Sequence, residues 1–216
     1  MRYQDFLIEY IKHSKDFFFV EIGAHDGAET KTGGKDSLYD LIKRFNLKGI
    51  LVEPQKYVFE DLEKNYAEQS HNLIFENVAI AEKNGKKKLY KLYKEPWEKD
   101  EHGRELTEHS SLLPIRSGLR YPYFEIVDCM TFNDLVGKYN VKKIDLLQID
   151  TEGYDYKIIK SINFKKIRPF IISYEHIHLS GADRVRCKKF LQKQGYEVFI
   201  LEDNNTCCIL SDKLKN

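Results

Sequence analysis

The segment from Phe18 to Gly27 most constrains the fold, because it joins a buried strand to a tight glycine turn. The apolar run 17–20 ends at Glu21, and Gly23 and Gly27 bracket a bend. Because glycine has no side chain, the backbone amides of such a bend can approach a ligand closely. The segment therefore predicts a strand of an α/β sheet whose carboxyl end borders a small-molecule site.

A second strand repeats this design. The apolar residues 49–52 are followed by Glu53 and Pro54. An acidic residue placed after the second strand commonly accepts hydrogen bonds from both hydroxyls of an adenosine ribose. We therefore expect Glu53 to bind the ribose of a nucleotide-derived cofactor.

The glycine spacing distinguishes between two cofactors that use this kind of fold. Dinucleotides are bound by Gly-x-Gly-x-x-Gly, whose amides and helix dipole hold a pyrophosphate. Here the turn reads Gly-Ala-His-Asp-Gly, and the carboxylates of Glu21 and Asp26 would repel a pyrophosphate. S-adenosylmethionine carries a cationic sulfonium and no phosphate, so the acidic turn favours it. An ordinary tight turn without a ligand is the alternative for this segment taken alone.

Composition indicates one enzyme-sized globular unit. The 216 residues, of which 42% are hydrophobic, can bury one core, so we predict a single domain over residues 1–216. The 35 basic and 34 acidic residues nearly cancel, which argues against a nucleic-acid partner. Apolar stretches are too short for a membrane span and no signal-peptide core follows Met1, so we expect a cytoplasmic protein. The four cysteines show no metal-ligand spacing and are expected to be buried free thiols.

Periodicity predicts alternating strands and helices, as in a parallel sheet covered on both faces. Strands are expected at 17–21, 50–53, within 72–81, and at 124–127, 144–150, 170–174, 196–201 and 207–210, with a weaker hairpin arm at 86–93. Helices are expected at 3–10, 57–66, 132–139 with Thr131 and Asp134 as a capping box, after Gly153, at 183–194, and from a cap at Asp36 or Ser37 through Phe45. Only residues 202–206 separate the last two strands, so these must form an antiparallel hairpin. A mostly parallel sheet that ends in such a hairpin is the usual shape of S-adenosylmethionine-dependent methyltransferases.

A second polar cluster follows the strand at 144–150. Ligands of open α/β sheets bind beyond the carboxyl ends of the strands, so Asp150 and Glu152 should face the same crevice as Glu21 and Glu53. The strand at 170–174 runs into His176, which is therefore expected near Asp150. A carboxylate and an imidazole would then lie beside the methyl donor.

Four blocks of the sequence together resemble a known family. They are Val20-Glu-Ile-Gly-Ala-His-Asp-Gly27, Leu51-Val-Glu-Pro54, Asn77-Val-Ala-Ile80 and Ile149-Asp-Thr-Glu-Gly-Tyr-Asp155. In these blocks the chain resembles the FkbM-type S-adenosylmethionine-dependent methyltransferases, most of whose assigned members methylate hydroxyl oxygens. The resemblance implies an α/β, Rossmann-like class I methyltransferase fold with helices on both faces of the sheet.

The resemblance also implies roles for single residues. Glu21 and Gly23 would hold the methionine portion of the cofactor, Glu53 its ribose, and Asn77 with Val78 its adenine edge. We expect the rest of the turn, His25, Asp26 and Gly27, and also Asp150, to line the cofactor site. Ser110 and Ser111 resemble a serine pair that such proteins carry before the strand at 144–150.

Methyl transfer from a sulfonium is an in-line displacement, so an enzyme must align the acceptor oxygen and remove its proton. Asp150 or His176 could be the general base, and His176 is favoured because an imidazole titrates near ~6.5 and a carboxylate near ~4. A divalent cation, Mg²⁺ or another, held by Asp150 and Glu152 with or without His176, is a second way to acidify a hydroxyl. A third reading is that Asp150 and Glu152 only cap the next helix and bond to the cofactor.

Residues 96–125 form an irregular insertion, which we interpret as a substrate lid. Its mixture of aromatic rings and cations suits a sugar ring or a phosphate-bearing acceptor. The expected substrate contacts are Trp97, Ser110, Ser111, Arg116, Glu152 and His176.

The sequence as a whole predicts an S-adenosylmethionine-dependent O-methyltransferase for a carbohydrate, a nucleotide-linked sugar or a similar small or glycan acceptor. A homodimer is one option for its oligomeric state. One alternative is a nucleotide-dependent oxidoreductase or epimerase, for which Tyr139 and Lys143 supply a Tyr-x-x-x-Lys pair, although at the wrong end of the sheet. The other alternative is a module that binds the cofactor and regulates a partner without catalysing a reaction.

Overall fold

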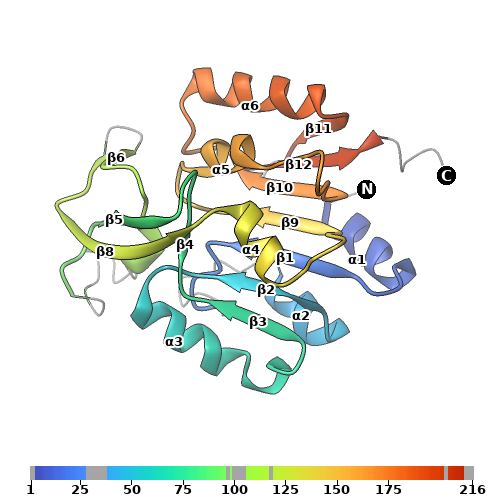
Figure 1. Cartoon of the computed structure of the whole chain (residues 1–216), viewed down its shortest axis with the longest axis horizontal. Helices are drawn as coiled ribbons and strands as arrows, with labels where there is room; N and C mark the ends of the chain where they lie inside the picture. The colour runs from blue at the N-terminus through green and yellow to red at the C-terminus, as the bar shows by residue number, and fades with distance from the viewer. Residues whose placement is uncertain are drawn as a thin grey trace.

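The computed structural model describes residues 3–27, 38–95, 98, 106–116, 119–201 and 204–211. Its largest element is a seven-stranded sheet (Figure 1), in the order β11 (Tyr196–Ile200), β12 (Asn205–Leu210), β10 (Ile171–Glu175), β9 (Leu146–Ile149), β1 (Phe18–Ile22), β2 (Lys48–Val52) and β3 (Leu73–Glu76). The strands from β10 to β3 pair in parallel, whereas β12 pairs antiparallel with both β10 and β11. The predicted sheet and its antiparallel hairpin are therefore confirmed.

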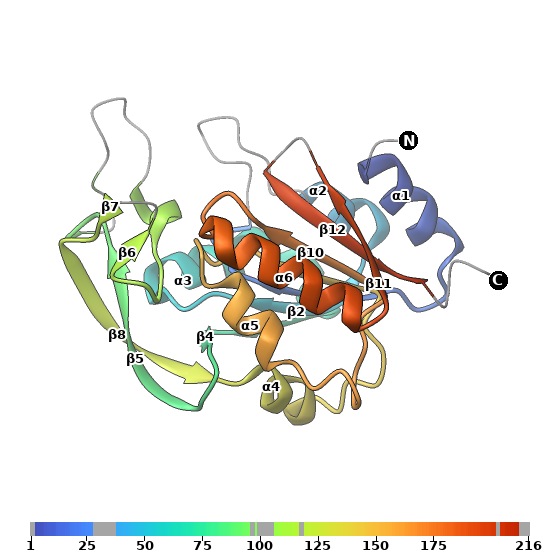
Figure 2. The same ribbon diagram turned by 90° about the horizontal axis from the view of Figure 1, so that it is seen from above.

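Helices cover both faces of this sheet. They are α1 (Tyr3–His13), α2 (Tyr39–Phe45), α3 (Lys56–Asn65), α4 (Phe132–Lys138), α5 (Asp155–Ser161) and α6 (Gly181–Lys193). Figure 2 shows α1 and α2 on one side of the sheet and α4 and α5 on the other. Four of the five residues in β1 and in β2 are buried, as expected for strands that have a helical layer on each side.

The two predicted helix starts have different outcomes. At α4 the Thr131 hydroxyl accepts a hydrogen bond from the Asp134 amide at 3.1 Å and donates one to the Asp134 carboxylate at 2.7 Å. The N-cap residue of α2 is Leu38, which forms no side-chain cap. Asp36 and Ser37, the expected caps of that helix, lie outside the described residues.

A smaller sheet lies beyond the carboxyl ends of the parallel strands (Figure 1). It consists of β4 (Ala79–Ile80), β8 (Tyr123–Met130) and β5 (Gly85–Lys91). The expected arm at 86–93 is β5, which pairs antiparallel with β8. The short helix η2 (Leu106–His109) and the paired strands β6 (Ile115–Arg116) and β7 (Leu119–Arg120) lie in the insertion between β5 and β8. The small sheet and η2 thus place residues near the carboxyl ends of the parallel strands.

Two expectations from composition can be compared with the structure. All four cysteines are buried and form no disulfide, as predicted. Within the described ranges, every helix is too short or too polar to cross a lipid bilayer.

Candidate functional site

A cavity of about 570 Å³ opens at the carboxyl ends of β1, β2 and β9. Its volume lies in the range of roughly 300–1,000 Å³ that is typical of small-molecule sites. Most of the predicted site residues line this cavity, namely Glu21, Gly23, His25, Asp26, Gly27, Glu53, Val78, Ser110, Ser111, Asp150 and Glu152. The structure therefore gathers at one site residues that are more than a hundred positions apart in the sequence.

Four predicted residues are placed differently or are not described. Asn77 and His176 do not line the cavity. Trp97 lies outside the described residues, as does the side chain of Arg116, although the backbone of Arg116 belongs to β6.

Gly23 is required by the contact between two strand ends. It has φ +85°, and a Cβ added here would lie 2.8 Å from the carbonyl carbon of Asp150 and even closer to its oxygen. Its amide donates to the Val52 carbonyl at 2.9 Å, and the Ala24 amide donates to the same oxygen at 3.1 Å. The missing side chain thus allows the end of β1 to pack against β9, and these two amides bond to β2.

Gly27 has a comparable packing role on the other side of the turn. A Cβ at this position would lie 2.6 Å from Leu62 Cδ1 and would also overlap the ring of Tyr66. Because Gly27 has φ +63°, a side chain here would be strained in addition. Both glycines therefore fit the turn tightly to the neighbouring elements, which fixes the shape of the cavity wall.

Glu21 is buried in the cavity wall and is held by the neighbouring strand. Its Oε1 accepts a hydrogen bond of 2.8 Å from Gln148 Nε2, and the two residues are register partners of β1 and β9. Gln148 also lines the cavity. Gln148 belongs to no sequence motif, although the register of two adjacent parallel strands could have indicated it.

Glu53 presents a buried carboxylate, with 3% of its surface exposed. Its Oε1 accepts from the Gln55 amide at 2.8 Å and its Oε2 from the His25 amide at 3.2 Å. Burial raises the pKa of Glu53, while His25 and the hydrogen bonds from Gln55 and His25 act in the opposite direction. This carboxylate therefore suits a ligand that donates further hydrogen bonds, as the two hydroxyls of a ribose do.

Asn77 contacts the backbone of Glu53 but does not line the cavity. Its Nδ2 donates to the backbone carbonyl of Glu53 at 2.8 Å, whereas the next residue, Val78, lines the cavity. An apolar side chain such as Val78 is suited to the face of an adenine ring.

Gln55 joins the end of β2 to the insertion and was missed by the sequence analysis. Its Nε2 donates to the Thr107 carbonyl at 3.1 Å, and its Oε1 accepts from the Ser110 hydroxyl at 3.1 Å and from the phenol of Tyr93. Thr107 Oγ1 is in turn 3.1 Å from His25 Nε2. Residues 107–110, part of the predicted lid, are thus tied to the cavity wall. A lone glutamine between two elements carries no recognisable motif, so pattern analysis could not find it.

Ser110 and Ser111, the predicted serine pair, form hydrogen bonds to different parts of the cavity wall. Ser110 bonds to Gln55, whereas Ser111 Oγ donates to the Glu152 carbonyl at 2.9 Å. Ser111 therefore holds the turn after β9 in place.

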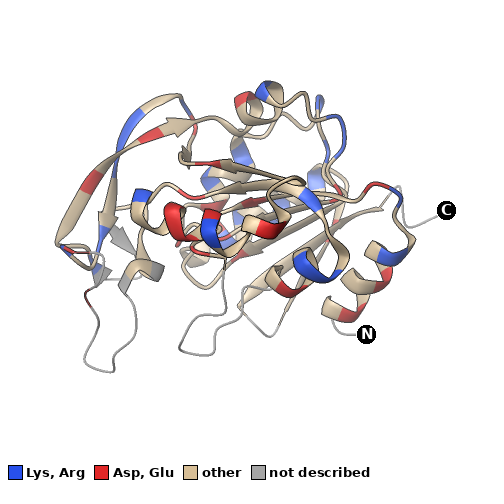
Figure 3. Ribbon diagram, turned by 90° about the horizontal axis from the view of Figure 1, so that it is seen from below, with Lys and Arg blue, Asp and Glu red and all other residues tan. Residues whose placement is uncertain are grey.

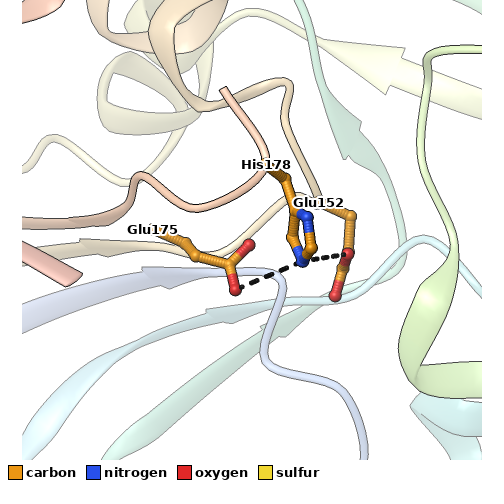
Figure 4. Close-up of side chains that lie close together, drawn as sticks. All are labelled: Glu152, Glu175 and His178. Atoms are coloured by element: carbon orange, nitrogen blue, oxygen red, sulfur yellow. Dashed lines mark ion pairs between the residues drawn. The ribbon is translucent and has the colours of Figure 1, made fainter. Parts of the chain in front are cut away.

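Asp150 and Glu152 both line the cavity, but among the described residues Asp150 belongs to no group of three side chains with metal-ligand spacing. The cluster with metal-ligand spacing within the described ranges is Glu152, Glu175 and His178, whose donor atoms lie within 4.8 Å of one another (Figure 4). His178 Nε2 is 3.4 Å from Glu152 Oε2, and His109 Nδ1 is 3.8 Å from Glu152 Oε1. Two imidazole groups, those of His109 and His178, therefore lie near Glu152, and no sequence motif connects them with it.

His176 does not line the cavity, and its ring lies against β12. Its ring Nδ1 is 3.1 Å from Thr206 Oγ1 on β12, and its amide donates to the Asn204 carbonyl. His178, two residues later, takes the place beside Glu152. The strand ends at Glu175, so the alternation of side-chain direction along a strand no longer indicates which histidine faces the cavity.

Asp155 is a fully buried carboxyl group at the start of α5. Burial, and to a smaller extent the nearby Asp150, raises the pKa of Asp155 to about 8. Its Oδ2 accepts from Thr151 Oγ1 at 3.1 Å and from the Gly153 amide at 3.2 Å. Asp155 is therefore largely protonated at neutral pH and stabilises the turn 151–153 without adding charge.

Asp155 should make the stability of the protein dependent on pH. Its pKa is about 8 in the folded state and 3.8 as the reference value, so the folded state binds more protons between these limits. The free energy of unfolding should then fall as pH rises from about 4 to about 8, by at most about 1.4 kcal/mol per pH unit. The Asp155→Asn variant should show a flatter profile in urea denaturation at pH 5 and pH 8. Equal slopes for the variant and the wild type would contradict this assignment.

The Tyr-x-x-x-Lys pair of the oxidoreductase alternative is engaged elsewhere. The phenol of Tyr139 donates to Glu76, and Lys143 Nζ is 2.8 Å from Asp145 Oδ1. Neither Tyr139 nor Lys143 lines the cavity. The structure therefore does not bring this Tyr-x-x-x-Lys pair to the cavity.

Comparison with known proteins gives one family and one fold. The sequence model of the family described as "Methyltransferase FkbM domain" matches residues 21–198. Among solved structures, the METTL16 MTase domain superposes with a TM-score of 0.51 and 13% identity, over 96% of this chain and 66% of that one. The precorrin-6y C5,15-methyltransferase from Geobacter metallireducens GS-15 superposes with a TM-score of 0.48 and 10% identity, over 95% of this chain and 85% of that one. No curated protein matches the sequence significantly.

Proposed function

Because this chain belongs to the FkbM methyltransferase domain family, we propose that it transfers a methyl group from S-adenosylmethionine to a hydroxyl oxygen. The acceptor in this proposal is a small polyol such as a carbohydrate or a nucleotide-linked sugar. The observation that carries the proposal is that Glu21 and Glu53, from the ends of two neighbouring strands, line one cavity.

The donor side of the cavity fits the cofactor. S-adenosylmethionine supplies an electrophilic methyl group on a cationic sulfonium. Glu21 with Gln148 would hold its methionine portion, Glu53 its ribose hydroxyls, and Val78 its adenine. Acidic side chains of the wall favour a cation over a pyrophosphate; they are Glu21, Asp26, Glu53, Asp150 and Glu152.

The acceptor side consists of residues suited to hydroxyl groups. Thr107, His109, Ser110 and Ser111 line the cavity from the insertion, next to the apolar Leu112. Hydroxyl and imidazole groups can donate and accept hydrogen bonds, as recognition of a polyol requires. Trp97 and Arg116 are proposed to extend this side.

A nucleic-acid acceptor has less support. The formal net charge is only +1, and Figure 3 shows Lys and Arg interspersed with Asp and Glu along the ribbon. Binding to a phosphate backbone depends on concentrated positive charge. The even distribution of charge therefore favours a small acceptor.

Asp150 is the group that we propose removes the acceptor proton. It is an exposed carboxylate at the end of β9, and the cavity provides its exposure. Asp150→Asn should lower kcat by roughly 10²–10⁴-fold, the usual contribution of a positioned general base. Asp128→Asn, on the surface of β8 beside Lys86, is the matched control and should leave kcat unchanged. Full turnover of Asp150→Asn with normal cofactor affinity would remove Asp150 from the mechanism.

Two measurements test the proposal as a whole. Calorimetric titration should show binding of S-adenosylhomocysteine and none of NAD. Turnover against a panel of hydroxylated acceptors should then give a methylated product. Binding of NAD in preference would favour the oxidoreductase alternative, and cofactor binding without turnover on any acceptor would favour a binding module.

A further inference from the structure

Three side chains capable of binding a metal converge at one edge of the cavity. Glu152 comes from the turn after β9, Glu175 ends β10, and His178 follows in the next loop. Figure 4 shows the imidazole of His178 between the two carboxylates. Glu152 also lines the cavity, so the cluster and the cavity share a residue.

The donor atoms of this cluster lie slightly farther apart than hydrogen-bonded atoms, near the separation of neighbouring ligand atoms around an ion. His178 Nε2 is 3.4 Å from Glu152 Oε2 and 3.7 Å from Glu175 Oε1. Hydrogen bonds from nitrogen to oxygen are shorter, about 2.7–3.2 Å. Ligand atoms around an ion with bonds of about 2.1 Å lie roughly 3.0–3.5 Å apart. A small inward shift of three side chains would therefore bring their donor atoms to ligand spacing, with water or an acceptor oxygen filling the remaining positions around the ion.

The backbone around the cluster is held in place. Arg184 donates to the carbonyls of Ile177 and Leu179, at 2.6 Å and 3.1 Å, on both sides of His178. A Cβ on Gly153 would lie 3.0 Å from the His178 carbonyl oxygen, so the two ligand-bearing loops touch. Ligand loops that are fixed before binding reduce the entropic cost of capturing an ion.

We propose that Glu152, Glu175 and His178 bind a divalent transition-metal cation at the acceptor edge of the cavity. One imidazole with two carboxylates suits Mn²⁺ or Zn²⁺ better than Ca²⁺, which prefers ligands made only of oxygen. An ion here would offset the charge of two adjacent carboxylates. Its role rests on the proposed function: an acceptor hydroxyl that coordinates the ion loses its proton more readily.

The direct test is metal binding by the full chain after removal of metals with a chelator. Titration with MnCl₂, followed by electron paramagnetic resonance, and calorimetry with ZnCl₂ should each show one ion per chain. His178→Ala and Glu175→Gln should weaken binding at least about 10-fold, because each removes one ligand. His176→Ala is the matched control in the same loop and should keep the wild-type affinity. Thermal denaturation of each variant shows whether it is folded.

Two results would overturn the proposal. One is the absence of stoichiometric binding of either ion, and the other is binding that the His178 and Glu175 variants leave unchanged. The titrations are carried out without cofactor or acceptor, so their failure is distinct from failure to bind S-adenosylhomocysteine. If His178→Ala lowered turnover in a protein that binds no metal, the cluster would be a proton-transfer group and the metal site would be wrong.

Discussion

Gly23→Ala should lower the free energy of unfolding by roughly 3 kcal/mol or more. This is a large effect for a substitution that removes no contact. The new Cβ would lie less than 3.0 Å from the carbonyl group of Asp150, and both clashing groups belong to the backbone. Neither can rotate away, because Gly23 and Asp150 are each bonded to a neighbouring strand end. Urea denaturation measures the loss.

Gly137→Ala is the control for this substitution. Gly137 lies within α4, and a Cβ there would meet no atom within 4 Å. Alanine in the last turn of this helix should stabilise the protein by no more than about 1 kcal/mol. If Gly23→Ala stayed within 1 kcal/mol of the wild type, as judged beside Gly137→Ala, the tight contact between β1 and β9 would be wrong.

Glu53→Gln should weaken binding of S-adenosylhomocysteine about 100-fold or more. The carboxylate can accept hydrogen bonds from two ribose hydroxyls, and each charge-assisted bond contributes about 1.5–3 kcal/mol. Glutamine keeps the shape of the side chain, but it replaces one acceptor oxygen with a donor. Calorimetric titration of the folded variant gives the change in Kd.

Glu76→Gln is the matched control for this experiment. Glu76 ends the adjacent strand β3, but its carboxylate bonds to Lys138 and Tyr139 and does not line the cavity. Its replacement should leave the Kd within about 3-fold of the wild type, which is under 1 kcal/mol. Equal losses in both variants would mean that Glu53 acts through general stability and not through the ribose.

Much of the fold could be predicted because its signals are local. The strands of the parallel sheet are short apolar runs, and the turn between β11 and β12 is too short for a crossover helix. The carboxyl ends of parallel strands meet at one edge of a sheet, so the residues after β1, β2 and β9 could be assigned to one site. The structure places Glu21, Glu53 and Asp150 there.

The remaining features depend on contacts between distant segments. The sequence does not show that the side chain of His178, rather than that of His176, reaches Glu152, because the loop after β10 has no periodic pattern. It also does not show that Gly23 is required by the Asp150 backbone. Spacing along the chain identifies a glycine turn, but it does not identify the atom that a side chain would meet.

The contacts of Gln55 restrict how this protein can change during evolution. One amide side chain, two positions after Glu53, uses both of its ends to hold Tyr93, Thr107 and Ser110. A glutamate at this position would lack the donor, and a leucine would lack both donor and acceptor. Divergence toward new acceptors is therefore easiest at insertion residues that do not touch this amide, while the three contact positions are expected to vary together with residue 55.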